Sequence, residues 1–227
     1  MKLARLLILS TLAWPIASLA SAQTPHAHDE PTAEPIAIGT VIPMRDHRML
    51  GVDGQRVSIG SVAGQRGTLV VFTCNHCPWA QAWESRIVAL GNAARGRGVG
   101  VIAINSNDPS EHADDAYAPM QERSRTAGMQ FPYVVDDTSN VARAFGATRT
   151  PEVFLFDGRG RLAYHGAVDD NAHEPASVQQ HYLRDAIDAL VAGRAITSAT
   201  TRSIGCTIKF RDAAAAPAAP ARGTRRR

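Results

Sequence analysis

Cys74 and Cys77 are separated by two residues, with His76 between them and Pro78 directly after. In the first turn of a helix, residues three apart face the same side, so a disulfide between them needs no backbone movement. A helix N-terminus also favours a thiolate over a thiol through its unpaired N–H groups and dipole. This C-x-x-C spacing predicts a redox-active dithiol: Cys74 attacks, Cys77 resolves the mixed disulfide, and His76 stabilises the Cys74 anion and makes the disulfide more oxidising.

Two other interpretations of the motif are weaker. A structural zinc ion needs four ligands, and the chain has no second C-x-x-C and no H-x-x-x-H motif. A structural disulfide would close a loop so short that it hardly constrains the unfolded chain. The position of the motif between a buried strand and a helix therefore favours redox chemistry.

The elements around the motif indicate an α/β domain with a central sheet. An unbroken apolar strand at residues 68–73 leads into the cysteines, and apolar residues spaced i, i+4, i+8 and i+11 from Trp79 mark the helix that follows. The other expected elements are a hairpin at Asp53-Gly54, strands at 99–105, 153–157 and 161–165, a helix at 114–126 that Pro119 interrupts, and a helix at 177–191.

The first 22 residues have the layout of a signal peptide, with a basic start, an apolar run that ends at Leu19, and small residues at 20–22. The run is shorter than the roughly 20 apolar residues of a spanning helix, and Pro15 interrupts it. We therefore expect cleavage before Gln23, export to the periplasm, and no stable membrane insertion after cleavage.

The net positive charge of the chain comes from its two ends. Residues 23–35 have the composition of a flexible leader, and residues 211–227 that of a disordered tail rich in Ala, Pro and Arg. The whole chain carries a formal charge of +3. Without residues 1–22 and 211–227, 17 basic residues stand against 20 acidic ones, a balance of −3. This mildly acidic remainder, residues 23–210, gives no indication of nucleic-acid binding.

Residues 36–210 resemble the thioredoxin superfamily, and within it the exported peroxiredoxin-like redoxins of the AhpC/TSA type that have a C-x-x-C active site. The resemblance implies a thioredoxin-like α/β fold, in which helices flank a central mixed β-sheet, with an N-terminal β-hairpin extension. It rests on four stretches, at residues 70–78, 148–157, 164–171 and 205–210.

Thr150-Pro151 matches the cis-proline position of that superfamily, where the loop lies opposite the active cysteines. A cis X-Pro bond makes a tight bend before a strand. The resemblance implies that the backbone of Thr150 pairs with an extended substrate segment beside Cys74. We therefore assign Thr150 and Pro151 to substrate binding.

Two departures from the family pattern matter for mechanism. Many thioredoxins carry a buried acid six residues before the first cysteine, and here that position is Thr68. Related peroxidases carry a threonine three residues before the reactive cysteine, and here that position is Val71. The first departure leaves the proton carrier open, and the second makes a thiol peroxidase the alternative function.

Cys206 makes the cysteine count odd. It is either a small buried apolar residue or a candidate accessory thiol within reach of the active-site face. A weaker alternative is a copper-binding module that uses Cys74 and Cys77 with His165 or His173. The copper-carrying relatives place three residues between their cysteines, which disfavours this reading.

The sequence as a whole predicts an exported thiol-disulfide oxidoreductase. Its Cys74–Cys77 dithiol is expected to exchange with thiols or disulfides of protein substrates and with a redox partner protein. We expect no cofactor, no metal and no nucleic-acid partner. The direction of exchange depends on the redox potential of the pair and on its partners.

Overall fold

A computed structural model describes residues 34–211. The predicted signal peptide, and all of the predicted leader and tail except residues 34, 35 and 211, lie outside the described residues. No helix in the described range is long and apolar enough to span a membrane.

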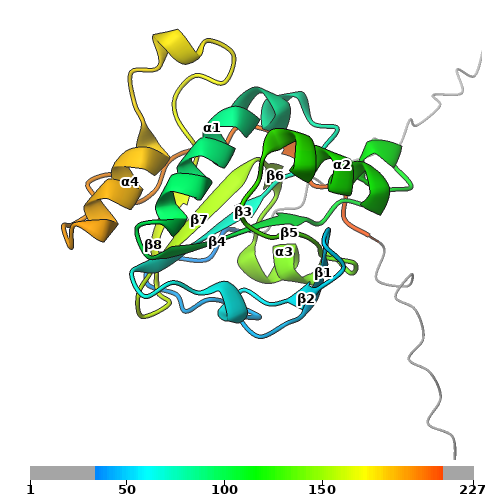
Figure 1. Ribbon diagram of the computed structural model, residues 1–227. Helices are drawn as coiled ribbons and strands as arrows, with labels where there is room; N and C mark the ends of the chain where they lie inside the picture. Colours follow the sequence, from blue (N-terminus) through cyan, green and yellow to red (C-terminus); the bar gives the residue numbers. More distant parts are fainter. Residues whose placement is uncertain (1–33, 212–227) are drawn as a thin grey trace, which may run out of the picture. The chain divides into compact units, whose positions relative to one another are not determined.

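A seven-stranded sheet forms the centre of this region, in the order β2-β1-β5-β4-β3-β7-β8 (Figure 1). Its strands are β1 (Met49–Gly51), β2 (Arg56–Val57), β3 (Gly67–Phe72), β4 (Val99–Asn105), β5 (Tyr133–Val135), β7 (Glu152–Asp157) and β8 (Leu162–Gly166). The pairs β3–β4 and β4–β5 are parallel, and the other pairs are antiparallel. The sheet is therefore mixed, as predicted, and β1 and β2 form the expected hairpin.

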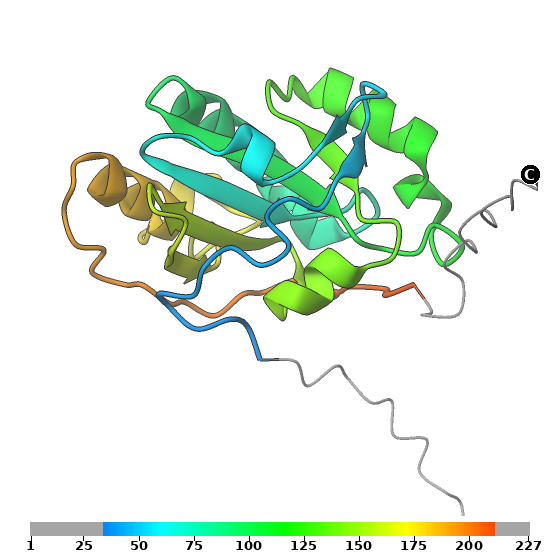
Figure 2. The same cartoon turned by 90° about the horizontal axis from the view of Figure 1, so that it is seen from below.

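Apolar residues on both faces of β3 explain its central position. Leu69 and Val71 pack on one face with the helices α1 (Pro78–Arg95), α2 (Tyr117–Ala127) and α4 (Tyr182–Val191). Val70 and Phe72 pack on the other face with α3 (Asn140–Phe145). Figure 2 shows α3 across the sheet from α1 and α4. Alternating side chains of one fully buried strand thus contribute to both layers of the core.

Several boundaries differ from the predictions. The segment predicted as a helix from residue 114 begins with a 3₁₀ turn, η2 (Ala113–Asp115), and α2 starts only at Tyr117. Pro119 then lies in the first turn of α2, where its missing N–H leaves no bond unmade, and so does not interrupt the helix. The last helix starts at Tyr182, five residues after the predicted start. The sequence patterns predicted neither β5 nor α3, because both are short.

Two further strands lie outside the main sheet. β6 (Arg149–Thr150) pairs with β9 (Cys206–Thr207) in a separate two-stranded sheet. The Thr150-Pro151 peptide bond is cis, as expected from the resemblance. The remaining 3₁₀ turns are η1 (Gly60–Val62) and η3 (Pro175–Ser177).

Candidate active site

The cysteine pair lies between β3 and α1, but neither cysteine is in the first turn of the helix. Cys77 is the N-cap of α1, in an extended conformation, and Pro78 is the first helical residue. A residue before proline avoids the helical region, and proline is favoured at the first helical position. Cys74 therefore lies in the preceding loop, so the thiol at the helix N-terminus is Cys77. This corrects the predicted placement of Cys74.

Thr150 of the cis-proline loop contacts both sulfurs. Its Oγ1 is 3.2 Å from Cys74 Sγ, and its carbonyl oxygen accepts a hydrogen bond from Cys77 Sγ at 3.1 Å. A carbonyl oxygen only accepts, so this contact needs a protonated Cys77. With Cys77 as a thiol, the Thr150 hydroxyl is placed to donate to a Cys74 thiolate. Cys74 is 4% exposed and Cys77 is fully buried.

The two thiols titrate as a coupled pair. A hydrogen bond with Cys74 lowers the pKa of Cys77 to about 4, and the Ala80 amide at the start of α1 also lowers it, against the effect of burial. The hydrogen bond with Cys77, burial and the charge of Asp115 raise the pKa of Cys74 far above its usual range. The pair therefore loses its first proton readily and its second with difficulty. The remaining proton is shared between two sulfurs that hydrogen-bond to each other.

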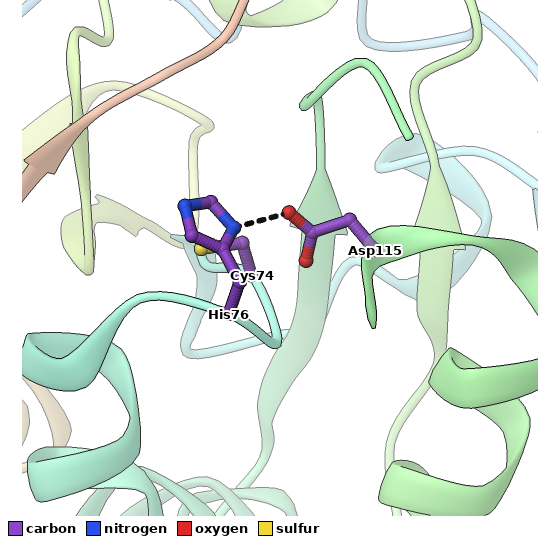
Figure 3. Close-up of side chains that lie close together, drawn as sticks. All are labelled: Cys74, His76 and Asp115. Carbon is purple, nitrogen blue, oxygen red and sulfur yellow. Dashed lines mark hydrogen bonds and ion pairs between the residues drawn. The ribbon is translucent and has the colours of Figure 1, made fainter. Parts of the chain in front are cut away.

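His76 pairs with Asp115, and the predicted effect on Cys74 is therefore indirect. His76 Nδ1 lies 2.5 Å from Asp115 Oδ2, and its ring stacks on His112 at 3.7 Å. Figure 3 shows the ring directed at the Asp115 carboxylate, with Cys74 beside it. Cys74 Sγ, a ring nitrogen of His76 and a carboxylate oxygen of Asp115 all lie within 4.8 Å of one another. The three residues thus form a compact group in which the histidine is held by the acid.

Asp115 is the buried acid that the sequence analysis did not find. Its side chain is fully inaccessible to solvent. Its carboxylate accepts hydrogen bonds from the backbone N–H of Asn75 at 2.6 Å and from Asn107 Nδ2 at 2.9 Å. Asn105 Nδ2 adds a longer contact at 3.3 Å. The carboxylate comes from η2, about 40 residues after the cysteines, rather than from β3. Thr68, the position expected from thioredoxins, is buried in β3.

Glu152 supports the cis-proline loop from the other side. Its Oε2 accepts hydrogen bonds from the backbone N–H groups of Thr148 and Arg149 at 2.9 and 3.0 Å, and its Oε1 lies 2.6 Å from His165 Nε2. Both side chains of the Glu152–His165 pair are buried. This pair holds the loop that presents Thr150 to the cysteines.

β9 lies along the outer side of the same loop. Thr150 is opposite Cys206 in the antiparallel β6–β9 register. Cys206 packs against the buried cluster of Cys74, Cys77 and Ala80. The Thr150 backbone that we expected to pair with substrate is therefore paired with the chain's own Cys206.

Comparison with known proteins shows the family of this chain. The model of the AhpC/TSA family matches residues 39–165, more than half of the chain. This chain belongs to the AhpC/TSA family. A hypothetical protein, SMc02350, from Sinorhizobium meliloti 1021 is 31% identical, with a TM-score of 0.73 over 78% of this chain and 97% of that one.

Other solved structures extend the comparison of this AhpC/TSA protein. An uncharacterized conserved protein from Geobacillus kaustophilus is 33% identical, with a TM-score of 0.72 over 81% of this chain and 94% of that one. A thioredoxin-like protein solved in its oxidized form is 15% identical, with a TM-score of 0.54 over 69% of this chain and 97% of that one. The last similarity shows the thioredoxin-like fold alone.

Two curated relatives carry functional names. The thiol-disulfide oxidoreductase ResA of Halalkalibacterium halodurans is 24% identical over 49% of this chain and 58% of its own length. The methylamine utilization protein MauD of Paracoccus versutus is 29% identical over 53% of this chain and 54% of its own length. This AhpC/TSA chain thus spans little more than half the length of these relatives.

The histidines considered as copper ligands have other contacts in this AhpC/TSA protein. His165 is bound to Glu152, and the ring of the exposed His173 lies 4.9 Å from that of Trp79. Within residues 34–211, no group of three potential ligands with atoms within 4.8 Å of one another includes either histidine. The structure therefore does not assemble the predicted copper ligands.

Proposed function

We propose that this chain is a thiol-disulfide oxidoreductase that exchanges its Cys74–Cys77 dithiol or disulfide with protein thiols or disulfides. The observation that carries the proposal is the pair of contacts that Thr150 makes with the two sulfurs. When the shared proton is on Cys77, its Sγ donates to the Thr150 carbonyl, and the Thr150 hydroxyl can donate to a Cys74 thiolate. The family assignment and the name of ResA also support it.

The exchange begins with a proton shift inside the pair. The proton on Cys74 moves to Cys77, which leaves a Cys74 thiolate beside the Thr150 hydroxyl. This thiolate attacks one sulfur of a substrate disulfide, and the other substrate sulfur leaves as a thiolate. Cys77 then attacks Cys74 Sγ and the bond between Cys74 and the substrate breaks. The second substrate sulfur leaves with the proton that Cys77 loses, and the Cys74–Cys77 disulfide forms. A redox partner protein returns the pair to the dithiol by the reverse steps.

Trapping of mixed disulfides tests both the exchange and the attacking sulfur. In a Cys77→Ser/Cys206→Ser variant we expect Cys74 to form adducts with protein substrates that a reductant releases. The matched Cys74→Ser/Cys206→Ser variant should form about tenfold fewer, because the remaining thiol is fully buried. Mass spectrometry of captured proteins measures both yields.

The outcomes separate two claims. Equal or larger yields from the Cys74→Ser/Cys206→Ser variant would make Cys77 the attacking residue. No adducts in either variant would reject the exchange function.

Export to the periplasm belongs to the same proposal and is supported by the composition of residues 1–22. An exported location supplies protein thiols that can be oxidised and persist as disulfides. When the full chain is expressed in a Gram-negative host, we expect the periplasmic product to begin at Gln23. N-terminal sequencing measures this, and an uncleaved product retained in the cytoplasm would contradict it.

A further inference from the structure

The C-terminal segment from Gly205 to Lys209 is seated against the cis-proline loop as an added strand. Cys206 is opposite Thr150, and Thr207 is opposite Arg149, in an antiparallel register. The Ile208 N–H donates to the Thr148 carbonyl at 2.9 Å. An extended chain that adds to a strand edge in this way is a recurrent mode of peptide recognition. We call residues 205–209 the strap.

Close approach of the strap to the loop requires a glycine. A Cβ atom on Gly205 would lie 2.2 Å from the Thr150 carbonyl oxygen and 3.2 Å from Pro151 N, both of them backbone atoms. Beyond the strand, the Lys209 N–H donates to Asn107 Oδ1 at 2.8 Å, and the Lys209 carbonyl accepts from the Asp108 N–H at 2.7 Å. The strap is therefore held at both ends beside the cysteines.

This seating puts a third sulfur next to the pair. Cys206 is partly exposed, whereas Cys77 is fully buried. Burial and a hydrogen bond with the Cys77 thiol raise the pKa of Cys206 to about 11, while the Lys209 charge lowers it. The contact that raises this pKa is with Cys77 rather than with Cys74.

We propose that Cys206 is a third redox thiol, which the strap presents to Cys77 in the place of a substrate thiol. The inference rests on the proposed exchange function, since it starts from the Cys74–Cys77 disulfide. Cys206 Sγ attacks Cys77 Sγ, the Cys74–Cys77 bond breaks, and a Cys77–Cys206 bond forms. Cys74 leaves as a thiolate and takes up the proton that Cys206 loses. No external oxidant or reductant is consumed in this step.

The transfer changes what faces solvent. The disulfide moves from a buried pair to a pair with one partly exposed sulfur, where a reducing partner can attack Cys206. Cys74, the more exposed sulfur of the original pair, is freed for another substrate. Because the strap holds Cys206 in contact with Cys77, a high effective concentration offsets its raised pKa.

Peptide mapping distinguishes the two disulfides cleanly. Trypsin releases residues 67–86, which hold Cys74 and Cys77, and residues 203–209, which hold Cys206. The reduced full-length chain is oxidised with limiting oxidised glutathione, quenched with acid at intervals, blocked with N-ethylmaleimide and digested. We expect an internal disulfide in 67–86 first and a cross-link from Cys77 to 203–209 afterwards. A Cys206→Ser variant should keep only the first product.

A Gly205→Ala variant tests the role of the strap. We expect it to reduce the yield of the cross-link about tenfold, because the new methyl group displaces residue 206 from the loop. Gly96→Ala is the matched control, since its Cβ would have an ordinary contact at 3.6 Å. Circular dichroism verifies that both variants are folded.

The results separate this inference from the proposed function. An internal 67–86 disulfide without any cross-link would overturn the third thiol alone, as would a cross-link that runs through Cys74. An unchanged cross-link yield in Gly205→Ala would overturn the role of the strap. Absence of both disulfides in the wild-type chain would overturn the exchange function itself.

Discussion

Replacement of Asp115 by alanine is expected to lower the free energy of unfolding of the reduced protein by about 3 to 5 kcal/mol. The carboxylate is fully inaccessible to solvent. It is hydrogen-bonded to the backbone N–H of Asn75, to Asn107 Nδ2 and to His76 Nδ1. Alanine leaves these buried donors without an acceptor. Urea denaturation followed by circular dichroism measures the change.

The Asp115→Asn variant removes the negative charge of this side chain and keeps its shape. The negative charge of Asp115 contributes to the raised pKa of Cys74, so its removal should lower that pKa. We expect Cys74 to react with iodoacetamide about tenfold faster at mildly alkaline pH, because a larger fraction of it is then thiolate. The variant should also unfold more easily than the wild type, since one amide group then faces the donors of its neighbours.

Asp137→Asn is the control for both measurements, because Asp137 is exposed. It should change the free energy of unfolding by less than about 0.5 kcal/mol. A loss of under about 1 kcal/mol in Asp115→Ala, together with unchanged Cys74 alkylation in Asp115→Asn, would show that Asp115 neither supports the site nor acts on Cys74.

The second large effect is expected in the pH dependence of the redox potential. The pKa of Cys77 is lowered to about 4 and that of Cys74 is raised, so reduction of the disulfide takes up one proton over the neutral range. The potential should then fall by about 30 mV per pH unit between roughly pH 5 and pH 8. Two cysteines with ordinary pKa values would take up two protons, with a slope of about 59 mV per pH unit.

The Cys77 thiolate also decides the direction in which the redox potential is shifted. A lowered pKa stabilises the reduced form, so the pair should be more oxidising at neutral pH than one with ordinary thiols. The corresponding stability of the reduced fold is fully present above pH 9.0, the unperturbed value, and is lost as the pH falls through about 4.

Equilibration of the Cys206→Ser variant with glutathione at several pH values measures this slope without the third thiol. A slope near 59 mV per pH unit across the whole range would contradict a shared proton in the pair.

An added Thr150→Val change should lower the rate of exchange, because it removes the hydroxyl beside Cys74 and keeps a branched side chain.

The local patterns of the sequence were sufficient for much of this account. The C-x-x-C motif after an apolar strand predicted that the cysteine pair lies between β3 and α1, and the resemblance to the thioredoxin superfamily at residues 148–157 predicted the cis Thr150-Pro151 bond. Apolar patterns predicted the strands β3, β4, β7 and β8 of the main sheet and three of the four α-helices within residues 34–211. These features depend on neighbours along the chain, which is why their spacing is visible in the sequence.

Contacts between distant segments were decided only by the tertiary structure. Asp115 reaches the cysteine loop from η2, whereas the sequence predicted only that a helix begins at residue 114. Pro78 is the first residue of α1, which makes Cys77 the N-cap and leaves Cys74 in the preceding loop. Cys206 meets Cys77 because β9 pairs with β6 across more than 50 residues. Pairing over such separations depends on the packing of the whole sheet, which no local spacing of residues records.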